Sequence, residues 1–139
     1  MLGANLNAMT PREIEILNFI AGADMGMAID RCRRKRDVSE RNIPLACTFL
    51  RQYLFLKAVT AGGMEIIDQA ADNLWHHWIL HTRQYREFNQ GISAAAGREV
   101  WLDHGPYENG DMTRHPGREV FFANYRRYFG RHYRDPIAA

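Results

Sequence analysis

The sequence lacks the features that mark several classes of protein. Among its 139 residues it has only two cysteines, Cys32 and Cys47, so it has neither a disulfide framework nor a Cys-x-x-Cys metal pair. No apolar run approaches the roughly 20 residues that a membrane-spanning helix needs. The amino terminus has no charged segment followed by an apolar run, which is the pattern of a signal peptide. These absences predict a cytoplasmic protein with no membrane contact.

Strong charge of one sign is also missing. Eighteen basic and sixteen acidic residues leave a net charge of +2, which is too small to imply a polyanionic partner by itself. The chain has no glycine-rich phosphate loop, no Gly-x-Ser-x-Gly elbow and no Cys-His nucleophile signature. No complete catalytic motif is therefore present, and the sequence leaves open whether the protein is an enzyme.

The length and the 12% content of aromatic residues predict one folded domain over residues 1–139. The clearest helix start is Thr10-Pro11-Arg12-Glu13, where threonine caps, proline suits the first turn and glutamate completes a capping box. Residues 91–115 lack helical periodicity, and Gly91 is expected to stop the preceding helix. The predicted fold class is all-α, a small bundle of four or five helices with an irregular segment at about 91–115. The expected helices cover about residues 10–21, 26–36, 44–59, 68–90 and 116–129.

The helix over 44–59 is apolar around most of its circumference, which predicts a position at the centre of the bundle. Large apolar side chains at helical spacing on three of the helices form the predicted core. These core residues are Phe49, Tyr53, Leu56, Trp75, Ile79, Phe121 and Tyr125.

Histidine and tryptophan are concentrated in the helix that Asp68 is expected to cap. Asp72 and His76 are one turn apart, so a helix places them on the same face. Together with His104, they could form a site of two histidines and one carboxylate for a divalent metal ion or a small ligand. Tyr85 and Tyr107 are the further candidate ligand-binding residues. An Asp-His pair could also supply a general base, with the carboxylate fixing the tautomer of the ring.

The structural alternative for the same residues is a buried polar clamp, and we favour it. In this interpretation Asp72 hydrogen-bonds the backbone or His76, and His76 ties the helix to the turn at His104, because buried polar groups must be paired. Gly105-Pro106 is expected to turn the chain so that His104 and Tyr107 face the helix.

Two further histidines and one cysteine have both a structural and a functional interpretation. His77 and His81 form an i, i+4 pair that could chelate a metal, but no third ligand is near in sequence, so we expect a solvent-facing pair. Cys32 lies among arginines that would lower the pKa of a thiol. Its place on an apolar helix stripe favours simple burial.

Arginines gather in two regions, residues 31–36 together with Arg41 and Arg51, and residues 126–134 interleaved with tyrosines. Arginine interleaved with aromatic residues suits single-stranded nucleic acid. Acidic residues are nearly as dense, so a solvated face is the favoured interpretation.

Four ordered pieces of the chain carry a family resemblance: residues 49–57, the pattern Asp72-x-x-Trp75-His76-x-x-Ile79-Leu80-x-Thr82-x-x-Tyr85-x-x-Phe88, His104-x-Pro106-Tyr107, and Tyr125-x-x-x-Phe129-Gly130. Together they resemble the glycine-rich-domain-containing protein-like family over about residues 45–130; the first 40 residues show no match. The chain departs from the family pattern at Trp78 and Asp103, where members often carry histidine, and at Asn89. The resemblance implies the position of a candidate site at Asp72, His76 and His104. It implies no activity for that site, because the family has no well-defined biochemical role.

Three functions remain open at this point. The leading hypothesis is a non-catalytic binding or accessory module that acts through a protein partner or as a homo-oligomer, and it predicts an exposed apolar or aromatic patch. The first alternative is a site built from Asp72, His76 and His104 that depends on a metal ion or a small ligand and could serve an enzyme. The second alternative is single-stranded nucleic-acid binding through the arginine and tyrosine clusters.

Overall fold

The computed structural model describes residues 2–60, 63–104, 117–131 and 133. Over these residues the regular structure is entirely helical, which confirms the all-α small bundle. The described residues form six α-helices and two short 3₁₀ helices, Leu6–Ala8 and Glu40–Asn42, which precede α1 and α3. The α-helices are α1 Pro11–Ala21, α2 Gly26–Lys35, α3 Ile43–Val59, α4 Gln69–Leu80, α5 Thr82–Ala96 and α6 Gly117–Phe129. No helix of the described chain is both long enough and apolar enough to cross a bilayer.

Local signals in the sequence set most helix ends. The side chain of Thr10 accepts a hydrogen bond from the backbone of Glu13, and the Glu13 carboxylate accepts one from the backbone of Thr10, so the predicted capping box is present. The Asp68 carboxylate accepts from the backbone N–H of Ala71, 2.8 Å away, and so caps α4 as predicted.

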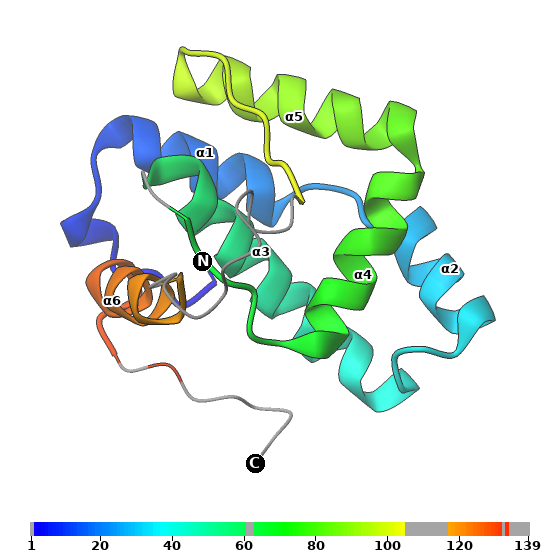
Figure 1. Cartoon of the computed structure of the whole chain (residues 1–139). Helices are drawn as coiled ribbons and strands as arrows, with labels where there is room; N and C mark the ends of the chain where they lie inside the picture. The colour runs from blue at the N-terminus through cyan, green and yellow to red at the C-terminus, as the bar shows by residue number, and fades with distance from the viewer. Residues whose placement is uncertain (1, 61–62, 105–116, 132, 134–139) are drawn as a thin grey trace.

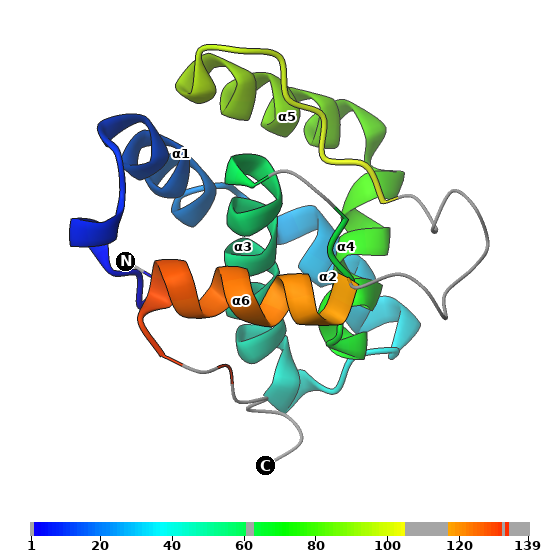
Figure 2. The ribbon, with the colours of Figure 1, turned by 60° about the vertical axis from the view of Figure 1, so that its left-hand side comes forward.

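The helix α3 lies at the centre of the bundle, as its apolar circumference predicts. It packs against α1, α4 and α6, and ten of its seventeen residues are buried. Figures 1 and 2 show α3 between α6 on one side and α4 with α2 on the other. Six of the seven predicted core residues are buried; Ile79 is half-buried and packs against the core.

The predicted helix over 68–90 is wrong in its extent, because it is two helices that meet at His81. His81 leaves the helical region of backbone conformation, with φ −85° and ψ 72°. Its ring Nδ1 lies 3.0 Å from the backbone oxygen of His77 and donates a hydrogen bond to it. The side chain therefore satisfies a carbonyl that the end of α4 would otherwise leave unpaired.

The irregular segment also begins later than predicted, because α5 passes through Gly91 and ends at Ala96. A Cβ atom at Gly91 would lie 2.0 Å from the ring of Phe19 on α1, so glycine here allows two helices to approach closely rather than stopping one. The helix ends instead at Gly97, whose φ of +67° suits the left-handed cap. Of the predicted segment, residues 97–104 are irregular and 105–115 lie outside the described residues.

Candidate functional site

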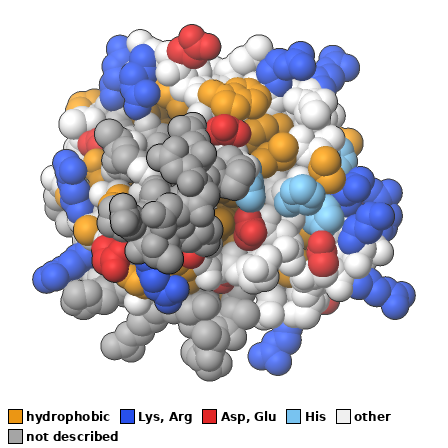
Figure 3. All heavy atoms as spheres, in the orientation of Figure 1, with side chains coloured by type: hydrophobic (Ala, Val, Ile, Leu, Met, Phe, Trp, Pro, Cys, Tyr) orange, Lys and Arg blue, Asp and Glu red, His pale blue; other side chains and the backbone are white. Residues whose placement is uncertain are grey.

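Two polar clusters lie on different sides of α4. The first, called here the Asp72–His104 clamp, consists of Asp72, Trp75, Tyr85 and His104. The second, the Arg31–His77–Asp37 chain, joins α4 to α2 and to the loop that follows α2. Figure 3 shows the surface of the molecule in the orientation of Figure 1. Histidine side chains are visible on it, and lysine and arginine side chains lie beside them on the side where Figure 1 shows α2.

In the clamp, Asp72 is paired with His104. The carboxylate Oδ1 of Asp72 is hydrogen-bonded to Nε2 of His104, and the two side chains are 31% and 30% exposed. The imidazole packs on the Trp75 ring, with 4.3 Å between the ring centroids. The hydrogen bond to Asp72 raises the pKa of His104 above its usual value of 6.5, although partial burial opposes this shift. The pair is therefore biased toward an ion pair that holds residue 104 against α4.

Tyr85 connects the same cluster to the segment after α5. Its hydroxyl accepts a hydrogen bond from Nε1 of Trp75, 3.0 Å away, and donates one to the backbone oxygen of Leu102. Burial raises the pKa of Tyr85 to about 12, so the phenol remains protonated and can continue to donate. Tyr85 is thus a structural link between α4, α5 and residue 102.

His76 is not brought into this cluster. It lies on the exposed stripe of α4, one turn from Asn73 and Leu80, and makes no hydrogen bond within the described part of the chain. The predicted link from His76 to the segment at His104 is made by Asp72 instead. Tyr107 and the turn at Gly105-Pro106 lie outside the described residues.

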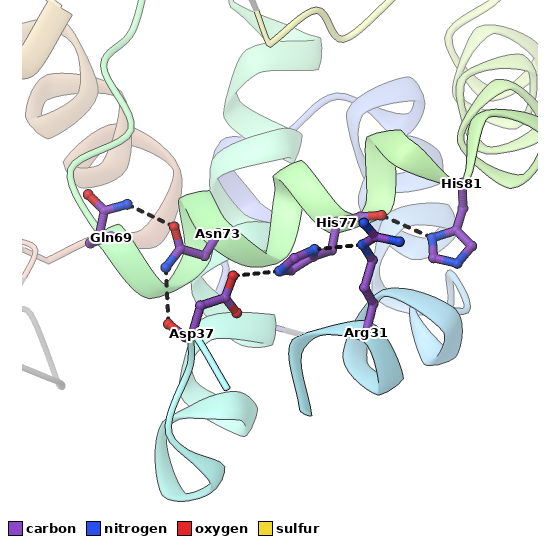
Figure 4. Close-up of polar contacts among 6 residues, drawn as sticks. All are labelled: Arg31, Asp37, Gln69, Asn73, His77 and His81. Carbon is purple, nitrogen blue, oxygen red and sulfur yellow. Dashed lines mark hydrogen bonds and ion pairs between the residues drawn. The ribbon is translucent and has the colours of Figure 1, made fainter. Parts of the chain in front are cut away.

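The Arg31–His77–Asp37 chain was not anticipated, because His77 was expected to face solvent (Figure 4). His77 is 5% exposed. The Nε of Arg31 donates to Nδ1 of His77 at 3.1 Å, and Nε2 of His77 lies 2.6 Å from the carboxylate of Asp37. Arginine is always a donor, so Nδ1 must be the acceptor, and the ring proton sits on Nε2 and is donated to Asp37.

Asn73 extends this chain along α4. Its side-chain amide donates to the backbone oxygen of Asp37 at 3.1 Å and accepts from Gln69 at 2.9 Å. Figure 4 shows these side chains of α4 facing the loop at Asp37. No sequence signal pairs residue 37 with residue 77, so the contact could not be predicted without the fold.

Within the described residues, the group of potential metal ligands that converges is Cys32, Asp37 and His77, not Asp72, His76 and His104. The three ligand atoms lie within 4.8 Å of one another. Two features oppose metal binding. Burial raises the pKa of the Cys32 thiol to about 12, which disfavours the thiolate that a metal requires. Arg31 also places a cation beside the ring and occupies Nδ1.

The arginine clusters do not form one surface. Figures 1 and 2 agree in placing α2 and α6 on opposite sides of α3. Several of the arginines already have structural partners: Arg31 binds His77, Arg33 pairs with Glu40, and Arg51 donates to the carbonyl oxygens at the end of α1. His132 and Arg134 lie outside the described residues. Among the described residues, this arrangement gives no continuous track for a nucleic-acid strand.

Trp101 is a candidate site residue that was not predicted from the sequence. This side chain is 56% exposed, the most of any large hydrophobic residue in the described chain, and its ring lies 5.7 Å from that of Tyr85. The sequence does carry a signal for this exposure. In an extended segment Glu99-Val100-Trp101-Leu102-Asp103, alternate residues share a face, so Val100 and Leu102 lie on one face and Trp101 lies with the two acids on the other.

Comparison with known proteins corrects the resemblance drawn from the sequence. No curated protein and no solved structure matches the chain. Nothing supports the glycine-rich-domain-containing protein-like family; the family model that matches is UCP032817-like, an uncharacterised family, over residues 19–109. The match includes α2, α3, α4 and α5, with both polar clusters and Trp101, and so covers more than half of the sequence. The chain belongs to the UCP032817-like family.

Proposed function

We propose that this protein is a non-catalytic binding module, and that its surface around Trp101 contacts a protein partner. The observation that carries the proposal is the exposure of Trp101 on a segment that is firmly held on both sides. Tryptophan is enriched among residues that dominate binding energy at protein interfaces. A large aromatic side chain that is exposed on a fixed backbone pays little entropy when it is buried by a partner.

Several side chains hold the segment on either side of Trp101. The guanidinium of Arg98 donates to the backbone oxygen of Ala58 on α3 at 2.8 Å. Val100 and Leu102 are buried, and their backbone groups are hydrogen-bonded to side chains of α5. The Asp72–His104 clamp closes the far end. These contacts fix the backbone at Trp101, and binding residues are often carried on loops that a rigid scaffold positions.

The geometry gives less support to catalysis. The clamp uses the Asp72 carboxylate to hold His104, and the phenol of Tyr85 is committed to Trp75 and Leu102. A general base needs an accessible lone pair beside a substrate. In the Asp72–His104 clamp the polar side chains instead hydrogen-bond to one another and to the backbone, as in a network that stabilises the fold.

Site-specific cross-linking in living cells tests the proposal. A photoreactive phenylalanine analogue replaces Trp101 in one variant and Ala94, an exposed residue of α5, in a matched control. We expect a protein adduct at position 101 that the control does not form, and the captured protein, once purified, must bind the unmodified chain. Equal adducts at both positions, or none at position 101, would contradict the proposal.

A further inference from the structure

The residues around Trp101 alternate between buried and exposed positions. Val100 and Leu102 are 9% and 1% exposed, whereas Glu99, Trp101 and Asp103 face solvent. A period of two residues is the pattern of an extended strand with one face on a core. In Figures 1 and 2 this segment runs back along α5 toward α4.

The hydrogen bonds of the segment follow the same alternation. The Oγ of Ser93 accepts from the N–H of Val100 at 2.9 Å. Its one proton lies within reach of the carbonyl oxygens of Val100, 3.0 Å away, and of Asn89, 2.9 Å away. Asn89 accepts from the N–H of Leu102 at 2.7 Å, and the Tyr85 hydroxyl donates to the carbonyl of Leu102. Three side chains of α5 thus take the place of a neighbouring strand along one edge of the segment.

The other edge is open. In an extended chain the N–H and C=O groups of alternate residues point to opposite edges, so those of Trp101 and Asp103 point away from α5. Within the described residues these groups have no hydrogen-bond partner. An exposed row of unpaired backbone donors and acceptors is a template on which an extended peptide can add as a strand.

We propose that the segment from Glu99 to Asp103 binds its partner by strand addition: an extended peptide of the partner pairs with the backbone of Trp101 and Asp103 and buries the indole. This inference rests on the proposed function and specifies the form of the partner. The backbone pairing supplies affinity, and Trp101 supplies the contact that discriminates between side chains.

The acidic residues beside Trp101 favour a basic peptide. Glu99 and Asp103 flank Trp101, so a strand with lysine or arginine opposite the acids and an apolar residue near the indole fits best. Lys57 lies near enough to Asp103 to offset part of its charge, so Glu99 makes the clearer contribution. A second copy of this chain is a poor occupant, because antiparallel pairing centred on Trp101 would set Glu99 opposite Asp103 at both ends.

The test uses hydrogen exchange of the full chain, followed by NMR. In the free protein the amides of Val100 and Leu102 should exchange slowly and those of Trp101 and Asp103 fast. A blocked Lys-Thr-Val-Thr-Lys peptide, which sets its two lysines opposite the acids and its valine opposite Trp101, is the probe, and it should slow exchange at Trp101 and Asp103. Its matched control carries N-methyl groups on two adjacent central residues, which blocks both edges of the peptide backbone, and it should protect neither amide.

Protection of Trp101 and Asp103 in the free chain would overturn the inference, as would equal protection by both peptides or by neither. The two proposals fail separately. If Trp101→Ala weakens binding of the cross-linked partner while N-methylation has no effect, the partner surface stands and strand addition is wrong. If the peptide protects both amides but the partner binds Trp101→Ala as well as the unmodified chain, the proposed function is wrong.

Discussion

The side chain of Arg31 on α2 donates a hydrogen bond to Nδ1 of the buried His77 on α4, across 3.1 Å. This contact fixes the tautomer of the ring, because an arginine N–H can only be met by a nitrogen lone pair. The proton on Nε2 is then directed at Asp37, so three residues from two helices and a loop form one polar chain.

The first prediction concerns that tautomer. In long-range ¹H–¹⁵N correlation spectra at neutral pH, His77 should show a protonated Nε2 and an unprotonated Nδ1. Replacement of Arg31 by alanine removes the donor and should let the Nδ1–H form appear. A spectrum of the unmodified protein with the proton on Nδ1 would show that Arg31 does not hold the ring.

The second prediction is that Arg31 keeps metal ions out of the converging ligands Cys32, Asp37 and His77. A metal on Nε2 requires Nδ1 to carry the proton, which would then face the Arg31 donor. In a competition assay against a chromophoric chelator, Arg31→Ala should bind Zn²⁺ more tightly than the unmodified chain. The double variant with His77→Ala is the control and should lose the gain. Tight one-to-one binding by the unmodified chain would refute this.

The third prediction is a pH dependence of stability that arises in the Asp72–His104 clamp. The pKa of His104 is raised in the folded state by its hydrogen bond to Asp72. Its stabilising contribution is therefore complete below the unfolded value of about 6.5 and is lost as the pH rises through the higher folded value. For a pair that retains contact with water, the contribution is about 1 kcal/mol or less.

Urea unfolding of the unmodified chain and of Asp72→Asn at about pH 6 and about pH 8 measures this effect. The advantage of the unmodified chain over the variant should be larger at the lower pH. An advantage that is the same at both pH values would mean that the pair does not titrate as described.

The fourth prediction concerns the Tyr85 hydroxyl. Tyr85→Phe leaves both the indole N–H of Trp75 and the carbonyl of Leu102 without their buried partner. The expected loss in free energy of unfolding is about 2 kcal/mol or more, from two unsatisfied buried groups. Tyr125→Phe is the matched control, because the described chain offers its hydroxyl no hydrogen-bond partner, and it should change stability little. Equal losses in the two variants would count against the role of Tyr85.

Helix ends could be predicted where their causes are local. The structure contains the predicted capping box at Thr10 and the predicted cap at Asp68, which depend only on neighbouring residues. The central position of α3 follows in the same way from its own apolar residues. The break at His81 and the passage of α5 through Gly91 depend on distant contacts, above all on the ring of Phe19 that lies against Gly91. A periodicity argument cannot detect a neighbour that comes from another helix.

The candidate site was harder to predict because α4 is covered on two sides. It packs against both α2 and α3, so its buried arc is wider than a single apolar stripe. One residue on a helix is a rotation of about 100°, and this step separates the exposed His76 from the buried His77. The sequence placed Asp72 and His104 in one cluster, but it predicted His76 as the link to residue 104, whereas the structure pairs Asp72 with His104 directly.

If Trp101 carries binding to a protein partner, as proposed above, Trp101→Ala should bind the cross-linked partner more weakly than the unmodified chain does. The matched control is Leu80→Ala, which removes a side chain that is 48% exposed on α4. By isothermal titration calorimetry, loss of a central aromatic anchor should weaken binding at least about tenfold, whereas the control should change it by less than about twofold. Equal affinities for Trp101→Ala and the unmodified chain would show that Trp101 does not contribute to binding of the partner.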